Sequence, residues 1–229
     1  MDLTTYYDNL YQASTTKIKK EGCETDRLIS SANDERFGIT LLLRPPLEVK
    51  NRIQQFLSEL KSVDAAQYYY PNTDLHITVM SIISCYSGFE LTKISVPVYV
   101  ELVQKSIAGI PPFTVRFKGI TASPSCVMVQ GFLQNEALHT LRNNLRENFR
   151  AAAVEQTIDK RYALQTAHAT VVRFRKELQQ QKEYLAILDK YRSFDFGTFT
   201  VQALELVYND WYQRHEHVML LHRFKLKST

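Results

Sequence analysis

The fold is decided by the stretch LHITV at residues 75–79, because the same arrangement returns as AHATV at residues 167–171. Both stretches are rich in β-branched and apolar residues, which predicts a strand in each place. Side chains alternate between the two faces of a strand, so the histidine and the threonine of each stretch share one face. A polar pair on an otherwise apolar strand is costly unless that face meets water or a ligand. The two pairs therefore indicate one polar cleft between two parts of the chain.

Each stretch ends a predicted strand–helix–strand unit, in which the helix carries its apolar side chains on one face. The motif of the second unit follows that of the first by 92 residues, a period too long for a solenoid repeat. The pattern favours two duplicated lobes. The units run through residues 36–44, 47–63 and 75–83, and through residues 125–132, 135–152 and 167–174.

The other segments complete an α+β pattern. We expect a bilobal fold with pseudo-two-fold duplicated lobes, in which two antiparallel sheets surround a central cleft and the helices lie outside. Residues 1–35 are predicted to form an N-terminal helical extension, and residues 36–229 one bilobal domain. Further helices are expected over residues 2–20, 96–110 and 176–191, and strands over residues 113–120, 199–208 and 217–226, the last two as a closing hairpin.

The composition is that of a globular protein. The 229 residues carry a formal net charge of +4, and 45% of them are hydrophobic. The longest apolar runs are far shorter than a membrane helix, and the polar start MDLTTYYDNLY is not typical of a signal peptide. The three cysteines, Cys23, Cys85 and Cys126, lie far apart, which favours reduced thiols in a cytoplasmic protein. The few glycines form no phosphate-binding loop, which disfavours nucleoside triphosphate chemistry.

The paired motifs HITV and HATV resemble those of the 2H phosphoesterase superfamily, which includes 2′-5′ RNA ligase-like proteins and cyclic nucleotide phosphodiesterases. The resemblance covers roughly residues 36–226 and leaves the segment before residue 36 outside the common core. It implies that His76, Thr78, His168 and Thr170 are the catalytic residues. It also implies that neither a metal ion nor another cofactor is needed.

The chemistry of the residues agrees with this implication. Cleavage of a phosphodiester needs a base that activates the attacking oxygen and an acid that protonates the leaving oxygen, and histidine fills either role near neutral pH. Threonine hydroxyls donate hydrogen bonds to the non-bridging oxygens. We expect a phosphodiesterase acting on 2′-5′-linked or 2′,3′-cyclic phosphates of RNA ends or small nucleotides, as a monomer without membrane contact. Either histidine fits either role.

Two other functions fit the same motifs. A non-catalytic nucleotide- or RNA-binding module would use the same cleft without turnover. A sugar epimerase of the mutarotase kind also needs an acid and a base, although the chain lacks the all-strand pattern of such enzymes. The alternative without a function is that the two histidine–threonine pairs are structural polar residues on half-buried strands.

Four further residues are candidates for substrate binding. Tyr70 and Tyr162 precede the motif strands and are predicted to stack on a nucleobase, unless they pack a loop onto the core. Tyr86 follows the first motif and is predicted to line the cleft. Arg173 is a candidate phosphate ligand, although strict alternation places it on the face opposite the second motif histidine. The histidines at residues 215 and 217 would share a face of a strand but lack a third ligand, so no metal site is expected.

Overall fold

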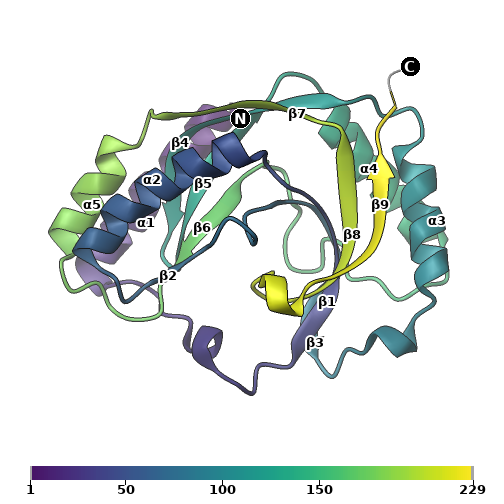
Figure 1. Cartoon of the computed structure of the whole chain (residues 1–229), viewed down its shortest axis with the longest axis horizontal. Helices are drawn as coiled ribbons and strands as arrows, with labels where there is room; N and C mark the ends of the chain where they lie inside the picture. Colours follow the sequence, from purple (N-terminus) through teal and green to yellow (C-terminus); the bar gives the residue numbers. More distant parts are fainter. Residues whose placement is uncertain (1, 228–229) are drawn as a thin grey trace.

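Two antiparallel sheets form the framework of the computed structural model, which describes residues 2–227 (Figure 1). The first, sheet A, contains in spatial order β3 (Ile77–Ser87), β1 (Arg36–Leu43), β8 (Ala203–Asp210) and β9 (Met219–Lys225). The second, sheet B, contains β2 (Tyr68–Tyr69), β6 (Ala169–Arg173), β5 (Cys126–Leu133), β4 (Phe113–Ser123) and β7 (Asp195–Val201). The predicted α+β class with two antiparallel sheets is confirmed. The two motif strands are β3, at one edge of sheet A, and β6, next to the short edge strand of sheet B.

The helices of the two sequence units exchange places. The α-helices are α1 (Leu3–Glu21), α2 (Leu47–Val63), α3 (Val96–Ile107), α4 (Ala137–Ala151) and α5 (Gln181–Lys190). Helix α2 follows β1 of sheet A and leads into β2 of sheet B, and it packs beside α5 and β7, on sheet B. Helix α4 connects two strands of sheet B but packs beside α3 and β3, on sheet A (Figure 1). Each lobe of the structure therefore contains the helix that belongs, in the sequence, to the strand–helix–strand unit of the other lobe. The two lobes do not coincide with the two predicted units.

Several predicted elements needed correction. The helix predicted over residues 47–63 is confirmed, whereas the helix predicted over 176–191 begins only at residue 181. The strand predicted over 199–208 is two strands, because the chain leaves sheet B at Gln202 and enters sheet A. Residues 215–217 form a 3-10 helix rather than part of a strand. None of the helices within residues 2–227 is long and apolar enough to cross a bilayer.

The N-terminal helix does not lie outside the cleft. Helix α1 packs along β4, where the hydroxyl of Thr121 donates a hydrogen bond of 3.0 Å to the carbonyl of Tyr7. Tyr7, Tyr11 and Ile18 are buried, so one face of α1 is part of the core. Helix α1 therefore covers sheet B along β4. The predicted domain boundary after residue 35 stays a prediction.

Candidate active site

A β-bulge follows the motif threonine on β3. Thr78 and Met80 pair with consecutive residues of β1, which leaves Val79 as an extra residue. An extra residue lets two neighbouring side chains turn to the same face. Val79 and Met80 are both buried, and Met80 and Ser81 both line the cavity that holds the motif histidine.

The same bulge occurs on β6. Thr170 and Val172 pair with consecutive residues of β5, so Val171 is the extra residue. Val171 and Val172 are both buried, and Arg173 returns to the face that carries His168. The predicted orientation of Arg173, opposite His168, was wrong because alternation does not hold across a bulge.

The two motif histidines line one cavity of about 490 Å³ between the sheets. His76 and His168 each precede their strand by one residue and are half-buried. The Nδ1 of His76 donates a hydrogen bond of 2.7 Å to the carbonyl of Asp74. The Nδ1 of His168 is 2.6 Å from the hydroxyl of Thr166. Both Nε2 atoms lack a hydrogen-bond partner within the described chain, so each ring is anchored on one side and free on the other.

Burial keeps both rings neutral. It lowers the pKa of His76 to about 4, and the charges of Arg44, His168 and Arg173 act in the same direction, against the carbonyl of Asp74. Burial also lowers the pKa of His168 to about 4, with Arg142 and Arg173 adding to the effect. A proton on His168 lowers the pKa of His76 further.

The motif threonines complete the polar wall. Thr78 and Thr170 line the cavity beside the histidines and are half-buried. Neither hydroxyl has a hydrogen-bond partner among residues 2–227. Gly131 on β5 allows the close approach of the segment before His168, because a Cβ there would lie only 1.8 Å from the carbonyl oxygen of Ala167.

Arg142 of α4 connects the two motifs through hydrogen bonds to their backbone carbonyl groups. Its side chain is fully buried, and its Nε donates a hydrogen bond of 2.9 Å to the carbonyl of Val79. One Nη donates to the carbonyls of Thr78 (3.0 Å) and Thr166 (2.8 Å). Thr166 in turn holds the ring of His168. The exchange of helices between the lobes is what brings this side chain to β3.

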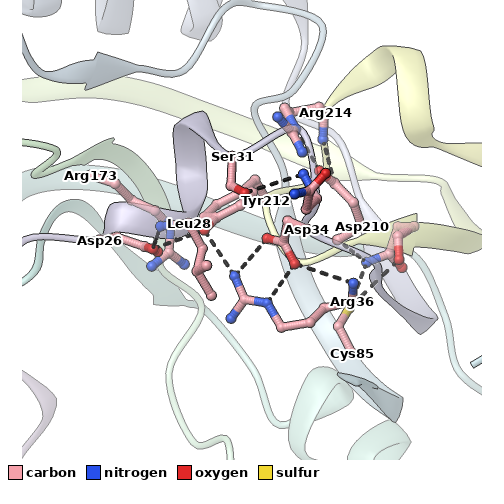
Figure 2. A network of polar contacts seen from close by, with 12 residues as sticks. Asp26, Leu28, Ser31, Asp34, Arg36, Cys85, Arg173, Asp210, Tyr212 and Arg214 are labelled. Atoms are coloured by element: carbon pink, nitrogen blue, oxygen red, sulfur yellow. Dashed lines mark hydrogen bonds and ion pairs between the residues drawn. The ribbon is translucent and has the colours of Figure 1, made fainter. Parts of the chain in front are cut away.

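Three arginines surround Tyr212, which follows β8 and lines the cavity (Figure 2). The guanidinium carbons of Arg36 and Arg173 lie 5.7 Å from the centroid of its ring, and that of Arg214 lies at 5.3 Å. Such distances are typical of cation–π contacts. Of these three arginines, Arg173 lines the cavity.

Two of these charges are neutralised by carboxylates. Arg36 donates two hydrogen bonds to Asp34, of 2.8 and 2.7 Å, and Arg214 donates one of 2.6 Å to Asp210 (Figure 2). Arg173 has no such partner: only its Nε is engaged within residues 2–227, with the hydroxyl of a tyrosine, and both Nη groups are free. Arg173 is therefore the arginine of the cluster that is prepared to bind an anion.

The three candidate tyrosines occupy different places. Tyr70 lines the cavity but is only 1% exposed, and its hydroxyl accepts the hydrogen bond of Arg173 at 3.0 Å, so it supports Arg173 rather than offering a free ring. Tyr162 lines the cavity and is 69% exposed, as a stacking residue requires. Tyr86 is not among the lining residues, because β3 carries it beyond the cavity and its hydroxyl donates to Glu155 at 2.7 Å.

Sequence reasoning missed several lining residues. The pattern of residues 209–213 indicates only a connection between strands, although Trp211 and Tyr212 line the cavity. Tyr6 of α1 also lines it, although the sequence indicates only a helical extension outside the common core for this segment. A cluster of aromatic and amide residues directly after β8 was the available signal. No group of three His, Cys, Asp or Glu side chains suited to a metal ion occurs in the described part of the chain.

Comparisons with known proteins agree with this geometry. The family model of the 2′-5′ RNA ligase superfamily matches residues 45–212. The structure of TT0787 from Thermus thermophilus is similar with a TM-score of 0.61 and 16% identity, covering 82% of this chain and 97% of that one. LigT of E. coli, complexed with 3′-AMP, gives a TM-score of 0.56 and 16% identity over 85% of this chain and 100% of that one.

A third similar structure is the protein of unknown function ATU0111 from Agrobacterium tumefaciens, with a TM-score of 0.53 and 12% identity over 93% of this chain and 99% of that one. These identities support the fold alone. No curated protein matches the sequence. The family match covers well over half of the chain and confirms the resemblance to the 2H phosphoesterases. The chain therefore belongs to the 2′-5′ RNA ligase superfamily.

Proposed function

We propose that the protein cleaves phosphodiesters of RNA ends or small nucleotides, either 2′-5′-linked or 2′,3′-cyclic, with His76 and His168 as a general acid and base. The observation that carries this proposal is the shared anchoring of the two rings. Each is held at Nδ1 by the protein, and each leaves Nε2 free in the same cavity. This is the arrangement needed to move two protons on opposite sides of one phosphate.

The proposed reaction needs no further group. One neutral imidazole removes a proton from the attacking water or hydroxyl as its oxygen bonds to phosphorus. The other imidazole takes up a proton when the negatively charged phosphate binds beside it, because a nearby negative charge raises its pKa, and it gives this proton to the leaving oxygen as that P–O bond breaks. Thr78 and Thr170 donate hydrogen bonds to the non-bridging oxygens, and the free Nη groups of Arg173 balance the negative charge.

The cavity suits a nucleotide better than a bare phosphate. Its volume of about 490 Å³ lies in the range of small-molecule sites. Tyr162 offers an exposed ring at its wall, where a base can stack. LigT, which shares the fold, was solved with 3′-AMP, and a nucleoside monophosphate is the product class proposed for this chain.

Product analysis tests the proposal. The protein is incubated in EDTA with 2′,3′-cyclic nucleotides and 2′-5′-linked dinucleotides, and products are identified by mass. Turnover is expected in the wild type, with losses of about 1,000-fold in His76→Ala and His168→Ala, each checked for folding by circular dichroism. Binding without products would identify a non-catalytic module, and full activity in either variant or a strict metal requirement would contradict the mechanism.

A further inference from the structure

A hairpin at the end of sheet B brings several hydrogen-bond donors to the cavity. A two-residue turn joins β4 to β5, and Ser123, Ser125 and Cys126 all line the cavity that holds the motif histidines. Arg173 of β6 pairs with Cys126 of β5, which in turn pairs with Ser123 of β4. Residues directly opposite each other on neighbouring strands point to the same face of a sheet. Ser123, Cys126 and Arg173 therefore form one row across three strands, here called the donor row.

The donor row contains more donors than acceptors. The hydroxyl of Ser123 lies 3.2 Å from the hydroxyl of Ser125 and 3.1 Å from the thiol of Cys126. These two contacts use two of the three O–H and S–H hydrogens, so one hydrogen is left without an acceptor in this group. Both Nη groups of Arg173 also lack a hydrogen-bond partner within the described chain. A guanidinium beside spare hydroxyl donors is typical of a site for phosphate.

The nearby carboxylate of Asp26 does not satisfy these donors. Its charge acts on Arg173, but it makes no hydrogen bond to the guanidinium. Its Oδ1 instead accepts hydrogen bonds from the hydroxyl of Tyr212, at 2.9 Å, and from the amide of Leu28, at 3.1 Å. The Nη groups of Arg173 therefore stay available to a ligand in the cavity.

The backbone of the hairpin turn is fixed on both sides. The carbonyl of Pro124 accepts a hydrogen bond of 2.8 Å from the amide of Glu24, and the carbonyl of Ser125 accepts one of 3.2 Å from Phe174. The amide of Ser125 donates to the hydroxyl of Ser123 at 3.3 Å, and both serines are half-buried. The hydroxyls are thus held in place before a ligand arrives, which lowers the entropy cost of binding.

The donor row extends too far from His168 to act on one phosphate alone. Arg173 follows His168 by five residues, one of which is the extra residue of the bulge, so the backbone advances roughly 13 Å along β6. Ser123 lies two strands across from Arg173, at roughly 10 Å. A phosphate held between the motif histidines therefore does not reach the hydroxyl of Ser123. The charge of Arg173, in contrast, acts on both rings.

We propose that Ser123, Ser125 and Arg173 bind a second phosphate group of the substrate, one that is not cleaved. The substrate is then a nucleotide with a phosphate beyond the scissile one, either a terminal monoester or the next phosphodiester of an RNA chain. Arg173 lies between the two phosphates, and its two Nη groups allow it to contact both. The inference rests on the proposed function for the position of the first phosphate.

Calorimetry with ligands that differ in their number of phosphates tests the inference. The probes are 3′-AMP, adenosine 3′,5′-bisphosphate and the dinucleotide ApAp, whose additional phosphate is an internal diester. In the wild type, at least one of the two doubly phosphorylated ligands is expected to bind about 30-fold more tightly than 3′-AMP. The ligand that shows this preference identifies the second phosphate as a terminal monoester or as an internal diester.

The serine variants measure what the hydroxyls contribute. The double variant Ser123→Ala, Ser125→Ala is expected to lower the preference about tenfold, because hydrogen bonds to a charged group are lost. The single variant Ser125→Ala leaves the turn bond to the Ser123 hydroxyl in place and should lower the preference about threefold. The affinity for 3′-AMP reports in each variant whether the cavity is intact.

The matched control is the double variant Ser81→Ala, Ser84→Ala. These two hydroxyls also form a pair, at 3.5 Å, and line the same cavity from β3. The control should leave the preference at its wild-type value. All of these variants keep the charge of the protein, so a general attraction of the more negative ligand does not alter the comparison.

The outcomes separate this inference from the proposed function. A wild type that binds all three ligands equally, a preference that survives Ser123→Ala, Ser125→Ala, or an equal loss in the control would overturn the inference, even in an enzyme that cleaves cyclic nucleotides. A preference that falls in the Ser123 and Ser125 variants and not in the control would support it, even in a protein that forms no product.

Discussion

The two motif strands share one backbone plan. Each carries a histidine just before the strand, a threonine on the same face, and a bulge at the next residue, Val79 on β3 and Val171 on β6. Both histidines use Nδ1 for anchoring and keep Nε2 free. The repetition shows that the same backbone plan presents each ring to the cavity.

The side chains around that plan differ at matching positions, 92 residues apart. Arg173 occupies the place that Ser81 has in the other half, and both line the cavity. Arg142 occupies the place of Lys50, whose side chain makes no hydrogen bond within the described residues. Positive charge and anchoring are thus concentrated in the half that contains His168. The same backbone plan in both halves therefore supports the acid–base pair. The different side chains at matching positions make one side of the cavity more positively charged than the other.

Of the proposed substitutions around the two motifs, the replacement of Arg142 is expected to lower kcat most strongly. Arg142→Met leaves three carbonyls around the motifs without their donor, so the spacing of the two rings is lost. We expect kcat to fall about 100-fold, as misplacement by about an ångström does, with a smaller change in KM.

The matched control for this change is Lys50→Met, at the same position of the other crossover helix. It should retain a kcat within about threefold of the wild type. Equal kcat values in the two variants, both shown to be folded, would mean that Arg142 has no positioning role. Urea denaturation reports the accompanying loss of stability separately.

A smaller effect is expected when the two halves are made alike at residue 173, which corresponds to residue 81 in the other half. Arg173→Ser copies Ser81 into the second half and removes the arginine of the Tyr212 cluster that has no carboxylate hydrogen-bond partner among residues 2–227. The loss of a charged hydrogen bond is expected to raise KM about tenfold or more, with kcat changed less. Ser81→Ala should leave KM near the wild-type value. An unchanged KM in Arg173→Ser would exclude Arg173 from phosphate binding.

A further expected effect, on stability rather than on turnover, is a dependence on pH. The pKa of each motif histidine is about 4 in the folded protein, below the ordinary value of 6.5, so the unfolded chain binds more protons between pH 4 and 6.5. Stability should therefore fall as the pH drops through this range, by at most about 1.4 kcal/mol per pH unit for each ring. Urea denaturation of the wild type and of a His76→Gln, His168→Gln double variant measures the difference. Identical slopes in the two proteins would show that the rings are not held neutral.

The motifs and the main elements follow directly from the sequence. Apolar periodicity predicts the helix over residues 47–63 and the strand from Arg36 because each buries a continuous face. The repeated histidine and threonine are local features, so their shared face and their common cavity could be predicted as well.

The features that could not be predicted depend on contacts between distant segments. Arg173 faces the cavity because of a bulge that exists only when β6 pairs with β5. The reach of Arg142 to β3 depends on the exchange of crossover helices, and the position of Tyr6 depends on how α1 packs.

The central proposal is that the two imidazoles act as a unit on one phosphorus atom. The most direct measurement is the kcat/KM of His76→Ala, His168→Ala and the double variant on one 2′,3′-cyclic nucleotide. Each single variant should lose about 1,000-fold, and the double variant little more, because residues that act together are strongly non-additive. Losses that multiply in the double variant, or a single variant with wild-type activity, would contradict the proposal.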